Sequence, residues 1–256
     1  MPPETEGFSP TEPIIDVSVN DTPARVPFWD YLDLALVIGL LVTSIFLILL
    51  AIGGFTLIYP KLKTDQGPLL LPMQFVLYGF VYLSFRLVFG LKYGKPVFAS
   101  LGWCRSKFNL AVAAIGGVLL AFVVSALAYL VHTPQVPSPV ESLMGSPVLL
   151  ALFGIMAVTV APLFEELFFR GFIQPLLSRT FGVVAGILIT AIVFGALHAP
   201  EYSLAWQYAL AVSIVGAVLG WVRSASNSII PSTVMHGSYN AVFVFALAVS
   251  KLTSHK

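Results

Sequence analysis

The sequence predicts an all-α fold, a polytopic bundle of about seven transmembrane helices. Three observations lead to this prediction. Hydrophobic residues make up 58% of the 256 residues, and charged residues only 10%. The mean hydropathy is +0.93, which is far from the composition of a soluble domain. The apolar residues also gather in runs of about 20, the length that a helix needs to cross a bilayer.

The two ends of the chain differ from its middle. Residues 1–27 hold five carboxylates against a single basic side chain, together with several prolines. This composition predicts a short, acidic, disordered tail. The stretch lacks the basic start and apolar centre of a signal peptide, so we expect the first apolar run to remain in the mature protein. Residues 251–256 form a short C-terminal tail.

The first three apolar runs cover residues 34–59, 69–91 and 108–131. The second run carries Arg86 near its end, from where the long side chain can reach the membrane surface. The basic segment 92–107 separates the second run from the third. Its stretch PVFASLGW is typical of the membrane interface, with Trp103 at headgroup depth.

The last four apolar runs cover residues 147–179, 183–198, 204–222 and 229–250. The fourth run begins at Pro147, because proline suits the first turn of a helix. This run is long and could kink at Pro175. Turns near residues 180–182 and 224–228 join the four runs into two hairpins.

Charge and cysteine content exclude several classes of function. The formal net charge is +1 and there is no basic cluster, so we expect no nucleic-acid partner. Cys104 is the only cysteine. A disulfide within the chain is therefore impossible, and so is a cysteine-rich metal site.

Two adjacent glutamates, Glu165 and Glu166, lie inside the fourth apolar run. An ionised side chain at the centre of a bilayer costs roughly 2.5 to 3.5 kcal/mol on insertion scales. Such residues are retained when they are paired, protonated or placed in a water-filled cavity. Arg170 follows Glu166 by four residues, so the two side chains share a helix face and can pair. Glu165 is then left free to act as a base.

Three further polar residues are expected at the same depth in the membrane. Glu165 and His198 lie about equally far from the turn at 180–182, so antiparallel packing brings them level. His236 and Asn240 are four residues apart and share one helix face. Their turn places them slightly lower, within reach of the other two given ordinary helix tilt. Polar residues from three helices can therefore meet at one site.

Each of these side chains has a chemical use. A carboxylate in an apolar pocket can take a proton from water, and a histidine can share that proton. Asparagine can donate its amide to a developing oxyanion. The same glutamates and histidines could instead hold a zinc ion, with Glu165, His198 and His236 as the ligands. The HExxH zinc motif is absent, so the residues leave metal dependence open.

Three motifs in this region resemble those of the CPBP family. EExxxR occurs from Glu165 to Arg170, FxxxH from Phe194 to His198, and HxxxN from His236 to Asn240. The family includes the CAAX prenyl endopeptidases and bacterial relatives linked to bacteriocin processing, self-immunity and lysostaphin resistance. The resemblance covers roughly residues 97–248. Any one motif is weak evidence, whereas the three in this order and spacing are specific.

The resemblance implies an intramembrane endopeptidase. On the family pattern, Glu165 and His198 activate the attacking water, and His236 and Asn240 stabilise the tetrahedral oxyanion. Glu166 belongs to the same catalytic set, with Arg170 as its structural support. Family members have been described both as metalloproteases and as metal-independent glutamate proteases. Zinc is therefore an implied but open cofactor.

The resemblance also sets the expected organisation and partners. We expect a membrane-associated peptide or protein substrate, prenylated or not, and a location in a bacterial inner membrane. Residues 97–250 would form the protease core, and the preceding helices carry no family signature. The expected units are an acidic tail (1–27), N-terminal transmembrane segments (28–96), the protease core (97–250) and a C-terminal tail (251–256).

Two other classes of function compete with the protease. Buried Glu and His residues also serve as proton relays in coupled transporters. A transporter, however, predicts inverted repeats and polar residues along the whole path. This chain has no repeat, and its polar residues lie at one depth. The other alternative is a catalytically silent membrane scaffold or immunity protein with the same fold, and a Glu165→Ala variant that kept its biological activity would favour it.

Overall fold

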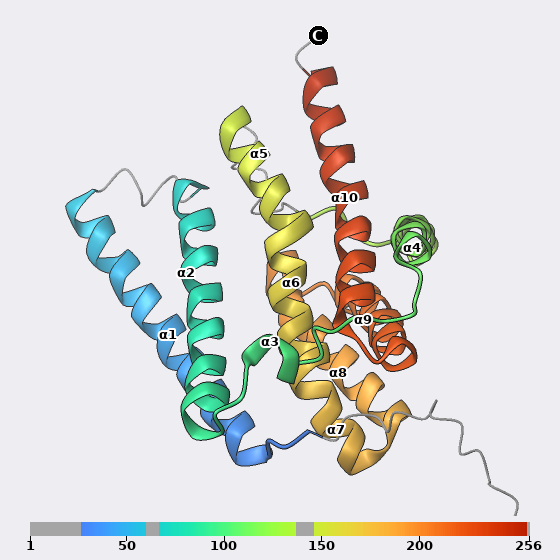
Figure 1. Ribbon diagram of the computed structural model, residues 1–256. Coiled ribbons are helices and arrows are strands. Elements are labelled where there is room, and N and C mark those ends of the chain that lie inside the picture. Colours follow the sequence, from blue (N-terminus) through green and yellow to red (C-terminus); the bar gives the residue numbers. More distant parts are fainter. Residues whose placement is uncertain (1–26, 60–66, 137–145, 255–256) are drawn as a thin grey trace, which may run out of the picture.

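The computed structural model describes residues 27–59, 67–136 and 146–254, and these form a bundle of helices with no β-strand (Figure 1). The predicted acidic tail lies outside the described residues except for its last position. The last two residues of the C-terminal tail also lie outside them.

Seven helical spans in the described part of the chain are long and apolar enough to cross a membrane, as predicted. The fourth is built from five consecutive segments without a break. The spans are α1 (Tyr31–Ile58); α2 (Gly67–Phe85) with the π-helical η2 (Arg86–Lys92); α4 (Leu110–Leu130); α5 (Pro147–Ile155), η4 (Met156–Val160), α6 (Ala161–Glu166), η5 (Leu167–Ile173) and α7 (Gln174–Phe181); α8 (Val183–His198) with η6 (Ala199–Tyr202); α9 (Trp206–Ser226); and α10 (Ile229–Ser254).

The first helix begins three residues earlier than the apolar run predicts. Asp30 caps it by accepting hydrogen bonds from the backbone N–H groups of Leu32 and Asp33, and Asp33 completes a capping box. Asp33 is buried and pairs with Lys92 of η2 at 2.5 Å. The Tyr93 hydroxyl donates to the same carboxylate at 2.6 Å, and this hydrogen bond raises the pKa of Tyr93. Asp33 is therefore a buried carboxylate near the start of α1 that binds α1 to the end of the second span.

The fourth span passes two prolines without ending. Pro162 and Pro175 cannot donate a backbone hydrogen bond. Each follows a π-helical segment, η4 and η5, and lies near the first turn of the next α-helical segment. π-Helical turns are rare and occur most often at functional sites. Here they flank Glu165 and Glu166 on both sides.

The N-terminal pair of helices packs against this fourth span (Figure 1). The buried rings of Phe85 and Phe89 in η2 contact Phe172 of η5 at centroid distances of 5.2 and 5.8 Å. Trp29 stacks on Phe172 and its indole N–H donates to the carbonyl of that residue at 3.1 Å. The phenylalanines that follow the glutamates are therefore packing contacts between spans.

The segment between the second and third spans docks against the hairpin turn of α9 and α10. It contains the short helix α3 (Val97–Ser100), followed by the fully buried Leu101. The backbone N–H of Ile229 donates to Gly102 at 3.0 Å, and the Ser228 hydroxyl donates to the Cys104 carbonyl at 2.6 Å. Trp103 stays partly exposed at 38%. The segment around Trp103, which the sequence predicts at the membrane interface, thus also fixes the turn between α9 and α10.

Glycines allow the helices around the site to approach closely. A Cβ on Gly216 of α9 would lie 3.1 Å from the Cα of Ala191 in α8. A Cβ on Gly220 would lie 2.8 Å from the side-chain oxygen of Gln174. Gly216 and Gly220, four residues apart, therefore let α9 pack closely against both α8 and α7.

Candidate active site

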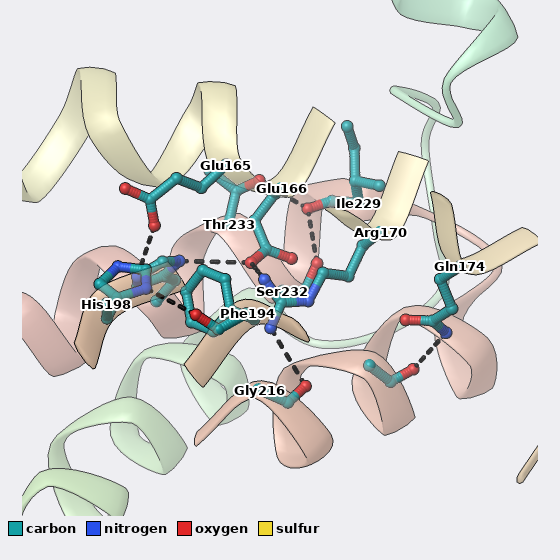
Figure 2. Close-up of polar contacts among 12 residues, drawn as sticks. Glu165, Glu166, Arg170, Gln174, Phe194, His198, Gly216, Ile229, Ser232 and Thr233 are labelled. Carbon is teal, nitrogen blue, oxygen red and sulfur yellow. Dashed lines mark hydrogen bonds and ion pairs between the residues drawn. The ribbon is translucent and has the colours of Figure 1, made fainter. Parts of the chain in front are cut away.

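Glu166 and Arg170 form a fully buried ion pair at the centre of the bundle (Figure 2). Nη1 of Arg170 donates to Oε1 of Glu166 at 2.8 Å. This is the pairing that their spacing of four residues predicts. Removing one partner of such a pair would leave the other charge buried without compensation. This is strongly destabilising, because an unpaired charge is far less costly in water than in the protein interior.

Arg170 is also held from the opposite side. Its Nη2 donates to the carbonyl of Gly216 at 3.1 Å, and its guanidinium lies 4.5 Å from the ring centroid of Phe194. One turn further along, the Gln174 amide donates to the Gly220 carbonyl at 2.9 Å and to the Ser224 hydroxyl at 3.0 Å. Side chains of the fourth span therefore reach backbone acceptors on α9, where glycine leaves them room (Figure 2).

His236 of α10 lies between the two glutamates. Its Nδ1 is 3.2 Å from Oε1 of Glu166, and its Nε2 is 3.7 Å from Oε2 of Glu165. The Glu166 carboxylate already accepts from Arg170, and an ionised carboxylate is an acceptor only. Nδ1 of His236 must therefore carry the proton of that contact. The other nitrogen, Nε2, is turned toward Glu165.

Glu165 differs from its neighbour in exposure. Its side chain is 21% exposed, whereas that of Glu166 is 0% exposed. One residue of displacement along the helix rotates the second carboxylate away from Arg170. The expectation that Glu165 stays free of Arg170 agrees with these contacts, but the carboxylate is not isolated. It meets His236 and also the hydroxyl of Tyr78 from α2, at 3.5 Å.

His198 ends α8 and is oriented by its own helix. Its Nδ1 lies 2.8 Å from the carbonyl of Phe194. A carbonyl only accepts, so Nδ1 carries the proton and Nε2 is the free base nitrogen. The family pattern leads us to expect Glu165 and His198 as partners, yet among the described ion pairs Glu165 is joined to His236. Glu201 of η6 interacts electrostatically with both His198 and Glu165, so the three side chains share one region.

Asn240 contacts the backbone of the fourth span. Its side-chain amide donates to the carbonyl of Ala157 at 2.8 Å. Ala157 lies in η4, five residues before Pro162. In a π-helix each carbonyl accepts from the N–H five residues later, and for the Ala157 carbonyl that residue is a proline, which has no N–H. Asn240 supplies this missing donor. One N–H of the amide is thereby committed, and the amide carries a second one.

The side chains as placed do not fit a zinc site. Within the described ranges no group of three or more His, Cys, Asp and Glu residues could hold a metal ion. Nδ1 of each histidine contacts a protein oxygen, which leaves Nε2 available, but the glutamates contact Arg170, His236 and Tyr78. The geometry therefore lends no support to a metalloendopeptidase.

Comparison with known proteins gives a match to one family over part of the chain. Residues 147–242 match the family model described as type II CAAX prenyl endopeptidase Rce1-like. This segment runs from the start of the fourth span into α10 and carries all seven residues that define the three motifs. The matched segment is therefore similar to the CAAX protease family, which the three motifs also resemble. No curated protein and no solved structure matches the chain.

The match supports a CAAX-type peptidase at the level of the family, and neither the transporter nor the silent scaffold is favoured. Sequence reasoning missed Tyr78, which lies outside the matched segment. A lone tyrosine in an apolar run has no distinctive pattern, so no signal in the sequence marks it. Sequence reasoning also gave Glu201 no role. The position of Glu201 three residues after His198 was the available clue.

Proposed function

We propose that this protein is an intramembrane endopeptidase in which Glu165 activates a water molecule for attack on a peptide carbonyl. The observation that carries the proposal is the position of His236 between two unequal glutamates. Glu166 is buried and neutralised by Arg170. Glu165 keeps an exposed edge, and in this proposal the attacking water reaches it there.

The proposed reaction begins with proton transfer from water to Glu165. The water oxygen forms a bond to the carbonyl carbon, and the negative charge moves to the carbonyl oxygen. Glu165 then passes its proton to the leaving amine as the carbon–nitrogen bond breaks. Atoms and charges balance without any group beyond water and the substrate.

The histidines have different roles in this scheme. Nε2 of His198 is a free base nitrogen and shares the proton of the attacking water with Glu165. His236 is oriented by Glu166. When its ring carries a proton on both nitrogens, the Nε2–H group donates a hydrogen bond to the oxyanion. The second amide N–H of Asn240 is the further oxyanion donor. Arg170 acts through Glu166, by fixing the carboxylate that orients His236.

The proposed substrate is a membrane-associated peptide or protein cut near its anchored end. A site that lies among apolar spans favours chains that are already held at the bilayer, prenylated or not. The proposed location is the inner membrane of a bacterial cell, and fractionation of cells that express the protein tests it.

The test uses purified full-length protein in liposomes with matched pools of prenylated and unprenylated peptides. Products are detected by mass spectrometry, with and without a zinc chelator. We expect cleavage by the wild-type protein, loss of cleavage in Glu165→Gln, and partial recovery in Glu165→Asp, which restores a carboxylate. We also expect the chelator to leave the rate unchanged. Cleavage that survives in Glu165→Gln would contradict the proposal.

A further inference from the structure

The second span supplies a polar group to the site from outside the segment that matches the family. Tyr78 lies within the second span and is only 6% exposed. Its hydroxyl is directed at Oε1 of Glu165 at 3.5 Å. Buried tyrosine hydroxyls find a hydrogen-bond partner because leaving them unpaired is costly. In this bundle that partner is the proposed catalytic base.

The tyrosine ring is held firmly enough to aim its hydroxyl. It stacks on Phe164, the residue directly before Glu165, with a centroid distance of 5.0 Å and an interplanar angle of 10°. Tyr78 therefore contacts two consecutive residues of α6. The Gln74 side chain, one turn earlier on α2, interacts with the same hydroxyl. The phenol donates its one proton to Glu165, because an ionised carboxylate can only accept.

The two oxygens of Glu165 thereby acquire different neighbours. Oε2 faces Nε2 of His236, and Oε1 faces the hydroxyl of Tyr78. A carboxylate contacted at both oxygens has few rotamers left, so its lone pairs keep a defined direction. Catalytic hydrogen bonds are often long before substrate binds and shorten in the complex. The 3.5 Å contact fits such a resting state.

We propose that Tyr78 is a positioning residue of the active site, whose hydroxyl orients the Glu165 carboxylate toward the attacking water. The N-terminal helices thus complete the catalytic site rather than only covering it. This inference rests on the proposed function, because it assigns Tyr78 a role through Glu165. It adds a residue that none of the three sequence motifs contains.

The test compares Tyr78→Phe with Tyr82→Phe in the full-length protein. Both variants remove one hydroxyl from α2 and keep the ring. Tyr82 lies one turn away, is 40% exposed and packs against Phe98 rather than the site. We expect Tyr78→Phe to lower kcat about tenfold, the scale of a hydrogen bond to a charged group, with KM unchanged. Tyr82→Phe should match the wild type.

A graded series separates orientation by the hydroxyl from simple packing. Fluorinated tyrosines at position 78 keep the shape of the side chain and change the strength of the phenol as a donor. We expect kcat to vary in one direction with that strength. Gln74→Met should lower kcat in the same direction by a smaller factor, and thermal unfolding in detergent should be unchanged for all variants.

The outcomes distinguish this inference from the function on which it rests. If wild-type protein shows no cleavage that depends on Glu165, the proposed function fails and the role of Tyr78 fails with it. If the wild type cleaves while Tyr78→Phe equals Tyr82→Phe in kcat, the role of Tyr78 alone is overturned. Equal kcat across the fluorinated series would overturn it as well.

Discussion

Glu165 and Glu166 are adjacent and chemically identical, yet the structure gives them opposite surroundings. Glu166 belongs to an inner region that is closed to solvent and joined to Arg170 and His236. Glu165 belongs to an outer region with His198 and Asn240, where every side chain keeps some exposure. The comparison teaches that a step of one residue along a helix is enough to separate a structural carboxylate from a reactive one.

The largest expected effect on stability falls on the inner region. Arg170→Met leaves Glu166 buried beside His236 without its cation, so we expect a loss of about 3 to 5 kcal/mol. Unfolding of the purified protein by denaturant in detergent measures it. The double variant Glu166→Gln, Arg170→Met removes both charges and should be more stable than Arg170→Met alone. A double variant that is less stable would mean that the pair stabilises the bundle by more than charge compensation.

The outer region should respond in rate instead. Asn240→Ala removes a proposed oxyanion donor, and we expect kcat to fall about 10²-fold. The same change deprives the Ala157 carbonyl of its donor, which costs about 1 kcal/mol of stability. Asn240→Asp is the matched control, because it keeps the size of the side chain but cannot donate when ionised. If Asn240→Asp kept the wild-type rate, the oxyanion role would be refuted.

The smallest expected effect is on the helix contact that supports both regions. A Cβ on Gly216 would lie 3.1 Å from Ala191, so Gly216→Ala should cost about 1 to 3 kcal/mol through overpacking. Gly39→Ala is the control, since a Cβ there meets nothing within 4 Å. The measurement is the midpoint of thermal unfolding of the two variants. Equal midpoints would show that α8 and α9 can move apart without a loss of stability.

Much of the fold could be predicted from the sequence, because membrane spans follow from the length of apolar runs. The pairing of Glu166 with Arg170 was also predictable, since it depends only on spacing within one helix. The early start of α1 was not, because Asp33 is retained there through Lys92 and Tyr93, which are remote in the sequence.

The partners of Glu165 and Asn240 could not be derived by counting residues. Counting assumes a uniform α-helix, whereas η4 and η5 change the register on both sides of the glutamates. Each π-helical turn rotates the following side chains relative to α-helical expectation. Asn240 therefore meets the Ala157 carbonyl, and Glu165 meets His236 and Tyr78. These contacts depend on how three spans pack, which no local pattern encodes.

The most direct test of the account is cleavage in water labelled with ¹⁸O, comparing wild-type protein with Glu165→Gln and Glu166→Gln. Mass spectrometry of the products reports both the rate and the origin of the new carboxyl oxygen. We predict one labelled oxygen in the new C-terminus for the wild type and a rate up to about 10⁴-fold lower for Glu165→Gln. Glu166→Gln should lose stability as well as rate. If Glu165→Gln cleaved the substrate at the wild-type rate, the assignment of Glu165 as the base would be contradicted.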